Sequence, residues 1–591
     1  MRRYTKLLIA GILVCFLTAC NGGNEAKGDG TAPAAGGDTS YFFGARVIPG
    51  DGSPVLEDQA IIVTNGKITT IGNRKDVFAP KTGARIDLTG RTVTPVFINL
   101  QAQPGMNNAN QYGPKNYSRD SVIADLSRYA YYGVMAVMSA GTDAGDLASS
   151  VRSEVREGKV KAAQLFTAGR GIAATGGGPA GLGETTIHVN SANDAKRAVT
   201  DLASQKVDVI KLWMDDGNGK GARLKTDAFT AAIDEAHKRS LKVVAEVFDL
   251  DDAKDLVKAG VDGFVNSIRD REVDDALISA MKEKNVLLAP ALTANEAKFV
   301  YADEPDWLGE QTMREVYPAK LVGYLKESVI INKFKRNPEL AALRQQYATA
   351  LKNVKKVSAA GVKVALGTNS GAADTYPGYF ELREMIAMAD AGMQPMDVIK
   401  AATSVPAAFL GLSDMGVLAV GKKADFLSMP NNPLEKMSNI KDIGVLYLNG
   451  SEQERSALIQ NITINVETLK ITAKDRQADA AAEAEARRQA EDAKLKHYGD
   501  FPLGKAQSFR GLSVPTPKYS TASVTIGPPD RVSVSMKGSA AQLRAFYAAA
   551  LPAYNWKPAG GCWEKESASK KTETLCVEAS NNSAVITVTE K

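Results

Sequence analysis

Histidine, cysteine and serine carry much of the metal and nucleophilic chemistry of proteins, and their spacing in this chain supports little of it. The 591 residues include three histidines, His188, His237 and His497, and no two of them lie close in sequence. No two histidines stand two residues apart, a spacing that could hold one metal ion. No Gly-x-Ser-x-Gly segment marks a nucleophilic serine either. The sequence therefore gives no direct sign of a histidine-based metal centre or of a serine hydrolase.

Two of the four cysteines lie in an N-terminal segment that has the features of an export signal. Basic residues at positions 2, 3 and 6 precede an apolar run at 7–17, which is too short to span a bilayer. The Leu-Thr-Ala-Cys that ends at Cys20 resembles the lipobox of bacterial lipoproteins, in which the cysteine is lipidated. We therefore predict a lipoprotein signal peptide at 1–20, lipidation of Cys20 and a flexible tether at 21–40. A plain cleaved signal with a chance cysteine is the alternative.

The other two cysteines, Cys562 and Cys576, are predicted to form a disulfide. Two cysteines that lie close together in an exported chain usually pair, because that compartment permits disulfides. The loop that they close is about 15 residues long, for which the chain-entropy model gives roughly 3 kcal/mol of stabilisation.

The composition is that of a globular protein with more than one domain. Apolar residues make up 44% of the chain and charged residues 24%, which excludes a wholly disordered protein. Lys and Arg number 72 against 67 Asp and Glu, an excess too small to indicate a nucleic-acid partner. The chain is too long for one hydrophobic core, and we expect two or three domains.

Eight short apolar runs alternate with helix-period segments through the middle of the chain. This alternation predicts an α/β fold, a (β/α)8 TIM barrel, with a doubly wound sheet as the alternative. In such a barrel the chemistry lies at the carboxyl ends of the strands. The glycine-rich segment 175–181 lacks the Gly-Lys-Ser/Thr ending of a phosphate-binding loop, so we interpret it as a loop over the barrel mouth. The eight runs lie near 94–100, 133–138, 163–167, 207–213, 242–248, 261–266, 286–292 and 362–367.

Short β-rich runs separated by turns occupy both sides of this alternation. Asn65-Gly66 between two of them is a hairpin signal, and similar runs return near 424–429 and 444–448. An Ala-rich, charged segment predicts a solvated linker helix before the C-terminal part. The predicted domains are a composite β-sandwich at 41–92 and 412–460, the barrel at 93–411, the charged helical linker at 461–499 and a small α+β domain with the disulfide at 500–591.

Several segments resemble the amidohydrolase superfamily, in particular its imidazolonepropionase- and prolidase-like members. Residues 91–103, Arg-Thr-Val-Thr-Pro-Val-Phe-Ile-Asn-Leu-Gln-Ala-Gln, are similar to the first barrel strand of that family. Further similar segments follow in the family's order, so the resemblance implies an amidohydrolase-like barrel and β-domain over about 41–460. These segments lie at 132–134, 207–213, 243–270, 367–371 and 421–426.

The resemblance also implies two divalent metal ions, typically zinc, at the barrel mouth. Such ions lower the pKa of bound water to about 7 and polarise a carbonyl group. The family holds them with histidines, an aspartate and a carboxylated lysine, and most of these are replaced here. The matching positions carry Gln101 and Gln103 on the first strand, Lys211 on the fourth, Glu246 on the fifth, Asn266 on the sixth and Asn369 on the eighth. Only the lysine is retained, and we expect no metal cofactor.

Without metal ions, Lys211 would be a plain ammonium, and a buried lysine needs a partner that Glu246 could supply. The four amide side chains could then complete a neutral hydrogen-bonded network. Two other interpretations stay open. Glu246 with amide oxygens could bind a hard cation, or Lys211 and Glu246 could work as a base and an acid.

These replacements favour a pseudoenzyme, inactive as a metal-dependent hydrolase, that acts in ligand binding or as an envelope scaffold. The alternative is a divergent hydrolase that cleaves amide or cyclic amide carbon–nitrogen bonds without the usual metal centre. A third alternative places the function mainly in residues 500–591. We expect an exported lipoprotein that faces the periplasm from the outer membrane, with a small-molecule or peptide-like ligand and no nucleic acid. The sequence leaves the oligomeric state open.

Overall fold

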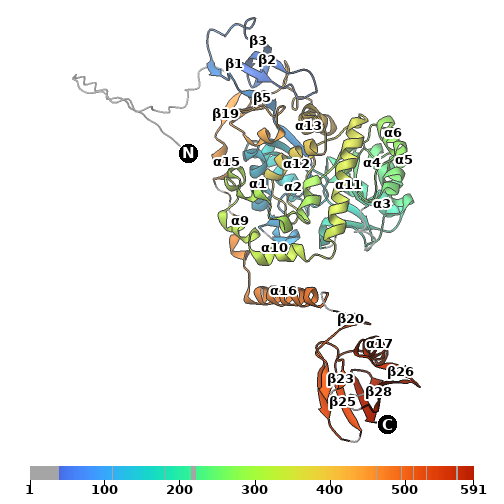
Figure 1. Ribbon diagram of the computed structural model, residues 1–591. Helices are drawn as coiled ribbons and strands as arrows, with labels where there is room; N and C mark the ends of the chain where they lie inside the picture. Colours follow the sequence, from blue (N-terminus) through green and yellow to red (C-terminus); the bar gives the residue numbers. More distant parts are fainter. Residues whose placement is uncertain are drawn as a thin grey trace, which may run out of the picture. The chain divides into compact units, whose positions relative to one another are not determined.

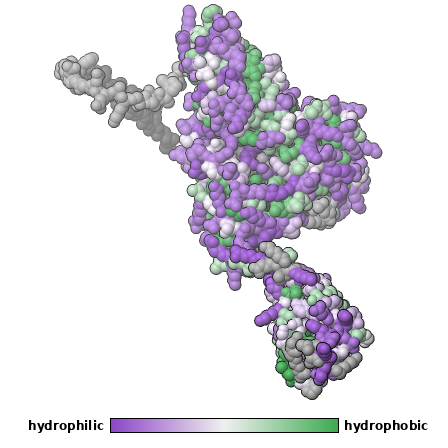
Figure 2. All heavy atoms as spheres, viewed as in Figure 1, coloured by the Kyte–Doolittle hydropathy of each residue, from purple (hydrophilic) through white to green (hydrophobic). Residues whose placement is uncertain are grey.

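The computed structural model describes residues 39–590 except 110, 180, 215–220, 461, 463, 494–495, 510–511, 528 and 567–569. Two compact units are visible in Figure 1: the described residues of Met1–Gly323 with Pro338–Leu469, and those of Tyr324–Asn337 with Lys470–Lys591. The predicted signal peptide, Cys20 and most of the tether lie outside the described residues. Hydrophilic residues predominate on the face shown in Figure 2. Within the described part, the chain has no helix long and apolar enough to cross a membrane.

The first unit contains a barrel of eight parallel strands. In chain order these are β6 Phe97–Ala102, β9 Val134–Ser139, β10 Gln164–Thr167, β13 Val209–Trp213, β14 Lys242–Glu246, β15 Gly263–Val265, β16 Leu287–Ala289 and an eighth segment at 363–370. The eighth segment closes the barrel, because Val364 bridges to Leu288 of β16 and Ser370 to Ala102 of β6. A backbone hydrogen bond also joins β10 to the residue before β13. Each of the eight apolar runs supplies one strand, so the predicted barrel is confirmed.

Helices follow the strands and cover the barrel (Figure 1). Local sequence signals mark where some of these helices begin and end. α1 Arg119–Tyr131 begins after Ser118, whose hydroxyl accepts from the backbone amide of Ser121. Gly260, with φ 98°, ends α5 Leu250–Ala259 in the left-handed conformation. The other helices of this part of the chain are α2 Leu147–Arg156, α3 Ala192–Ser204, α4 Thr226–Lys238, α6 Asp275–Glu283, α7 Leu292–Ala297, α8 Gln311–Arg314, α9 Ala319–Leu325, α11 Leu340–Ala359, α12 Tyr379–Asp390, α13 Pro395–Ala402, α14 Ser404–Leu410 and α15 Arg455–Ile459.

Strands from both sides of the barrel segment pair in one eight-stranded sheet, in the order β19-β18-β17-β5-β1-β2-β3 with β4 beside β1. Asn65 and Gly66, both with positive φ, form the two-residue turn of the predicted hairpin between β2 and β3. The rings of Phe42, Phe426 and Tyr447 pack together and tie the early strands to the late ones. The strands are β1 Thr39–Val47, β2 Leu56–Thr64, β3 Lys67–Asn73, β4 Ala84–Asp87, β5 Thr92–Pro95, β17 Phe426–Met429, β18 Val445–Leu448 and β19 Ser451–Gln453.

Apolar side chains fill the barrel, and α14 packs against the amino ends of its strands. Ala407 and Phe409 of α14 belong to the same buried cluster as Leu100, Val244 and the other inward-facing strand residues. Lys242, the first residue of β14, donates from Nζ to the carbonyl of Phe409 near the end of α14. The barrel interior is therefore a packed core that α14 closes at the amino ends of the strands. The polar residues of the barrel lie at the carboxyl ends of the strands.

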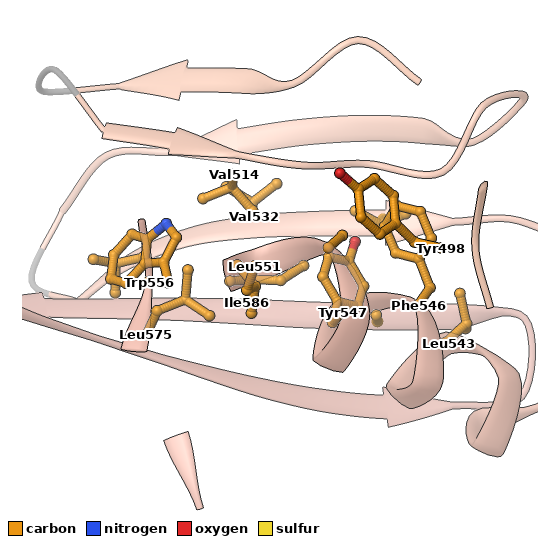
Figure 3. Close-up of a cluster of buried hydrophobic side chains, with 14 of the residues drawn as sticks. Tyr498, Val514, Val532, Leu543, Phe546, Tyr547, Leu551, Trp556, Leu575 and Ile586 are labelled. Carbon is orange, nitrogen blue, oxygen red and sulfur yellow. The ribbon is translucent and has the colours of Figure 1, made fainter. Parts of the chain in front are cut away.

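The second unit contains a six-stranded antiparallel sheet, in the order β24-β25-β29-β28-β27-β26, with α17 Ala540–Ala550 against it. Figure 3 shows Phe546 and Tyr547 of this helix among the sheet residues of the core. Cys562 in β27 and Cys576 in β28 form the predicted disulfide. α16 Ala473–Ala493 is exposed along most of its length. Further elements are α10 Ser328–Lys335, β20 His497–Tyr498, β21 Phe501–Pro502, β22 Gln507–Phe509, β23 Leu512–Val514, β24 Thr521–Thr525, β25 Asp530–Ser535, β26 Lys557–Ala559, β27 Cys562–Glu566, β28 Thr572–Ser580 and β29 Ser583–Glu590.

Candidate functional site

The six residues that the sequence singles out all lie at the carboxyl ends of barrel strands, where barrel enzymes place their chemistry. The barrel register brings them to one end of the barrel even though they are spread over about half of the chain. They are Gln101 in β6, Gln103 just beyond it, Lys211 in β13, Glu246 at the end of β14, Asn266 after β15 and Asn369 in the eighth segment.

Lys211 and Glu246 form a buried ion pair in the centre of this group. Lys211 Nζ lies 3.1 Å from Glu246 Oε2 and 3.4 Å from the carbonyl oxygen of Ala140. The ammonium also lies 3.7 Å from the ring centre of Trp213, within the range of a cation–π contact. The lysine side chain is wholly buried, and that of Glu246 is 11% exposed. The charge of Lys211 is therefore neutralised inside the protein.

Two glycines leave the space that this arrangement needs. A Cβ at Gly141 would lie 2.8 Å from Cγ of Lys211, and a Cβ at Gly171 would lie 2.0 Å from Nε1 of Trp213. Gly171 is the first residue of β11 Gly171–Ala174, which pairs with β12 Thr186–Val189 beside β13. A larger residue at position 171 would force the indole away from the ammonium.

The carboxylate of Glu246 is also held by amides. Asn266 Nδ2 donates to Oε1 at 3.2 Å, and Gln101 Nε2 makes a long contact with Oε2 at 3.5 Å. Asn266 is fixed in turn, because its Oδ1 accepts from Asn295 Nδ2 at 2.9 Å and from the amide of Ser267 at 2.8 Å. Both carboxylate oxygens therefore have partners, and the amide donors set the orientation of the group.

A second hydrogen-bonded group lies at the rim. Gln103 Nε2 donates to Asn369 Oδ1 at 2.7 Å, and the hydroxyl of Tyr112 donates to Gln103 Oε1. Tyr112 belongs to a short hairpin after the first strand, made by β7 Asn107–Asn108 and β8 Gln111–Tyr112. Burial, together with the negative charge of Glu246, raises the pKa of the Tyr112 hydroxyl well above its usual value. The hydroxyl therefore stays protonated and acts as a donor.

Apolar side chains cover the network. Met106, Ala173, Leu182 and Trp213 form one buried cluster, with Tyr112 and another tyrosine packed against it. Leu182 follows the glycine-rich segment 175–181, so the described part of that segment leads into the cover. Gln101 and Lys211 are 0% exposed, and Glu246 is 8% exposed. The Lys211–Glu246 pair is therefore largely buried, and Trp213 of this apolar cluster lies against the ammonium.

A buried carboxylate supports the first and eighth strands from behind. Glu381 accepts hydrogen bonds from the hydroxyls of Thr368 and Ser370 and from Asn99 Nδ2 at 2.6 Å. Asn99 Oδ1 in turn accepts from the amide of Gln101 at 2.8 Å. Burial raises the pKa of Glu381 despite these donors. This layer fixes the backbone that presents the two glutamines.

Comparison with known proteins agrees with this architecture. Residues 223–452 match the model of the amidohydrolase family. A solved Xaa-Pro dipeptidase with bound methionine in its active site is similar to this chain with a TM-score of 0.57 at 20% identity, covering 70% of this chain and all of the other (100%). Molinate hydrolase gives 0.56 at 17% identity (74% and 98% covered), and an ochratoxinase of A. niger 0.55 at 19% (70% and 95%). No curated protein matches the sequence.

The barrel-bearing part of the chain matches the amidohydrolase family model over residues 223–452 and shares the fold of these solved structures. Its mouth does not fit the two-metal centre that the sequence resemblance implies. Glu246 is the one carboxylate at the six positions, and its oxygens already accept from Lys211, Gln101 and Asn266. An ammonium in this place also repels a divalent cation. Among the described residues, no group of three or more His, Cys, Asp or Glu could hold a metal ion.

Several residues other than these six lie apart from the barrel mouth or outside the described residues. His188 is exposed in β12, and His237 is exposed in α4. Cys20 lies outside the described residues, as do the aspartates at 215 and 216. Tyr112 and Asn295, which complete the network, were not predicted because they lie outside the barrel strands and no local motif marks them.

Proposed function

We propose that this protein is a pseudoenzyme of the amidohydrolase superfamily in which a buried ion pair takes the place of the metal centre. The observation that carries the proposal is the pairing of Lys211 Nζ with Glu246 Oε2 at 3.1 Å beneath Trp213. A charged ammonium has no lone pair to give to a metal ion or a substrate. The amide side chains around the pair hold it in place instead of binding water or metal.

The burial of the pair argues against the alternative, a divergent hydrolase of carbon–nitrogen bonds. Such an enzyme must place a scissile bond within about 3.5 Å of its catalytic groups. Trp213 lies against the ammonium of Lys211, and the side chain of Glu246 is only 11% exposed. The barrel then serves in ligand binding or as a scaffold, and the second unit supplies a separate folded body for contacts in the envelope.

An assay of hydrolysis tests this proposal. Xaa-Pro dipeptides, N-acyl amino acids and cyclic amides would be incubated with the protein, with and without added Zn²⁺, Mn²⁺ or Co²⁺. We expect no turnover above that of Lys211→Met, a variant that removes the ammonium and keeps the length of the side chain. Turnover by the wild type that Lys211→Met abolishes would establish the divergent hydrolase instead.

We further propose that the protein is an exported lipoprotein, anchored through Cys20 in the outer membrane and facing the periplasm. The basic start, the short apolar run and the lipobox-like end of residues 1–20 support this proposal. In cell fractionation, the wild type should sediment with membranes and Cys20→Ser should be released on lysis in low-salt buffer. If both distribute alike, the anchor proposal fails.

A further inference from the structure

A pocket lies at the end of the barrel opposite the mouth, between the amino ends of the strands and α14. Its volume is about 260 Å³, a little below the roughly 300–1,000 Å³ of pockets that take drug-sized ligands, so it suits a small one. Eight of its ten lining residues come from five elements that the barrel holds together, the other two, Asp262 and Asn285, lie in loops, and all ten are described. The pocket is therefore built into the fold.

Three lysines surround this pocket. Lys242 begins β14, Lys363 begins the eighth barrel segment and Lys400 lies in α13. Asp262 is the one acidic residue among the described residues of the lining, and its Oδ2 already accepts from the amide of Val243 and from a ring nitrogen of His237. The lining therefore carries a net positive charge. The proximity of Lys363 helps to lower the pKa of Lys242, after burial as the larger cause.

Apolar side chains form the wall beside the lysines. Val405, Ala408 and Phe409 of α14 line the pocket together with Leu287 of β16. Phe409 and Leu287 belong to the buried core of the barrel, and Val405 packs against it. Lys242 Nζ is fixed at the carbonyl of Phe409 and lies 4.6 Å from the centre of its ring. A cationic side and an apolar side thus face the same small space.

We propose that this pocket binds a small amphipathic organic anion, a carboxylate with a short hydrocarbon tail. The carboxylate would lie against Lys363 and Lys400, where it relieves the repulsion among the lysines, and the tail would cover Val405 and Phe409. An uncharged ligand would leave the excess positive charge of the lining uncompensated, and a bare anion would leave the apolar wall exposed to water. The site is separate from the barrel mouth and does not depend on the function proposed for it.

Equilibrium dialysis of the purified chain with radiolabelled octanoate tests the proposal. We expect one saturable site, and binding of octanol, which has the same tail without the charge, should be at least roughly tenfold weaker. Lys363→Glu should weaken octanoate binding roughly tenfold or more, because it reverses a charge at the exposed rim and leaves the core intact. Circular dichroism would confirm that this variant is folded.

The matched control is Lys282→Glu, an exposed lysine of α6 that does not line the pocket. It changes the net charge of the protein by the same amount and should bind octanoate as the wild type does. The proposal is overturned if octanoate shows no saturable binding at millimolar concentrations, or if octanol binds equally well. Equal binding by Lys363→Glu would also overturn it, because the octanoate would then lie elsewhere.

Discussion

Glu246→Gln tests the buried ion pair most sharply. The change keeps the size of the side chain but removes the carboxylate that lies 3.1 Å from the wholly buried ammonium of Lys211. Loss of one partner of a buried pair costs about 3–5 kcal/mol. The carbonyl of Ala140 at 3.4 Å and the ring of Trp213 still contact the ammonium, and a desolvated cation–π contact contributes up to about 2 kcal/mol. We therefore expect the free energy of unfolding to fall by about 3 kcal/mol.

Urea unfolding followed by far-ultraviolet circular dichroism measures this loss. Lys211→Met should cost a similar amount, because it leaves the carboxylate unpaired. The double variant Lys211→Met/Glu246→Gln should lose much less than the sum, with a coupling energy of about 2–3 kcal/mol, because no buried charge remains. Glu283→Gln on the exposed face of α6 is the control and should change stability by less than about 0.5 kcal/mol. A cost below about 1 kcal/mol for Glu246→Gln, or additive single variants, would refute the buried pair.

Three further changes test the packing around Trp213, the titration of a buried carboxyl and the disulfide of the second unit. Gly171→Ala should displace the indole of Trp213 and destabilise the fold by about 1–3 kcal/mol, seen as stronger acrylamide quenching of tryptophan fluorescence. Gly323→Ala is the control: a Cβ there meets nothing within 4 Å, so the change should be neutral or stabilising. Equal effects of Gly171→Ala and Gly323→Ala would contradict the contact between position 171 and the indole of Trp213. Burial raises the pKa of the Glu384 carboxyl in α12 from 4.5 to about 7, so the folded state binds this proton more tightly than the unfolded chain does. The free energy of unfolding therefore falls by about 3 kcal/mol in all as the pH rises from about 4.5 to about 7. Glu384→Gln should flatten the pH dependence of the urea midpoint, and an unchanged slope would speak against the shift. Serine at both disulfide cysteines should cost the second unit about 3 kcal/mol and speed its proteolysis, leaving the barrel unaffected; unchanged protease resistance would contradict this.

The barrel could be predicted because short segments of the sequence determine its strands and its helix ends. Each strand is a buried apolar run, and local signals mark helix ends, as Asp274 does before α6 and Gly260 after α5. The eighth strand is the least regular of the eight, since it is held by isolated bridges at Val364 and Ser370. Its apolar run at 362–367 was still sufficient to predict it.

The site could be predicted only in part. The charges of Lys211 and Glu246 require a partner when buried, so their pairing follows from their types and strand positions. The partners that complete the network could not be inferred in that way. Tyr112 reaches Gln103 from an irregular hairpin, and Asn295 reaches Asn266 from a helix one strand further along the barrel. Such contacts depend on the closure of the whole barrel.

If the ion pair has replaced the metal centre, the purified protein should retain no divalent metal ion, and its metal content can be measured. The purified chain would be exposed to Zn²⁺, Mn²⁺ and Co²⁺, dialysed extensively and examined by inductively coupled plasma mass spectrometry. We expect no stoichiometric metal in the wild type. One or two tightly held ions per chain, lost in Glu246→Gln, would contradict it, because a divalent ion would then share the place assigned to the ammonium of Lys211.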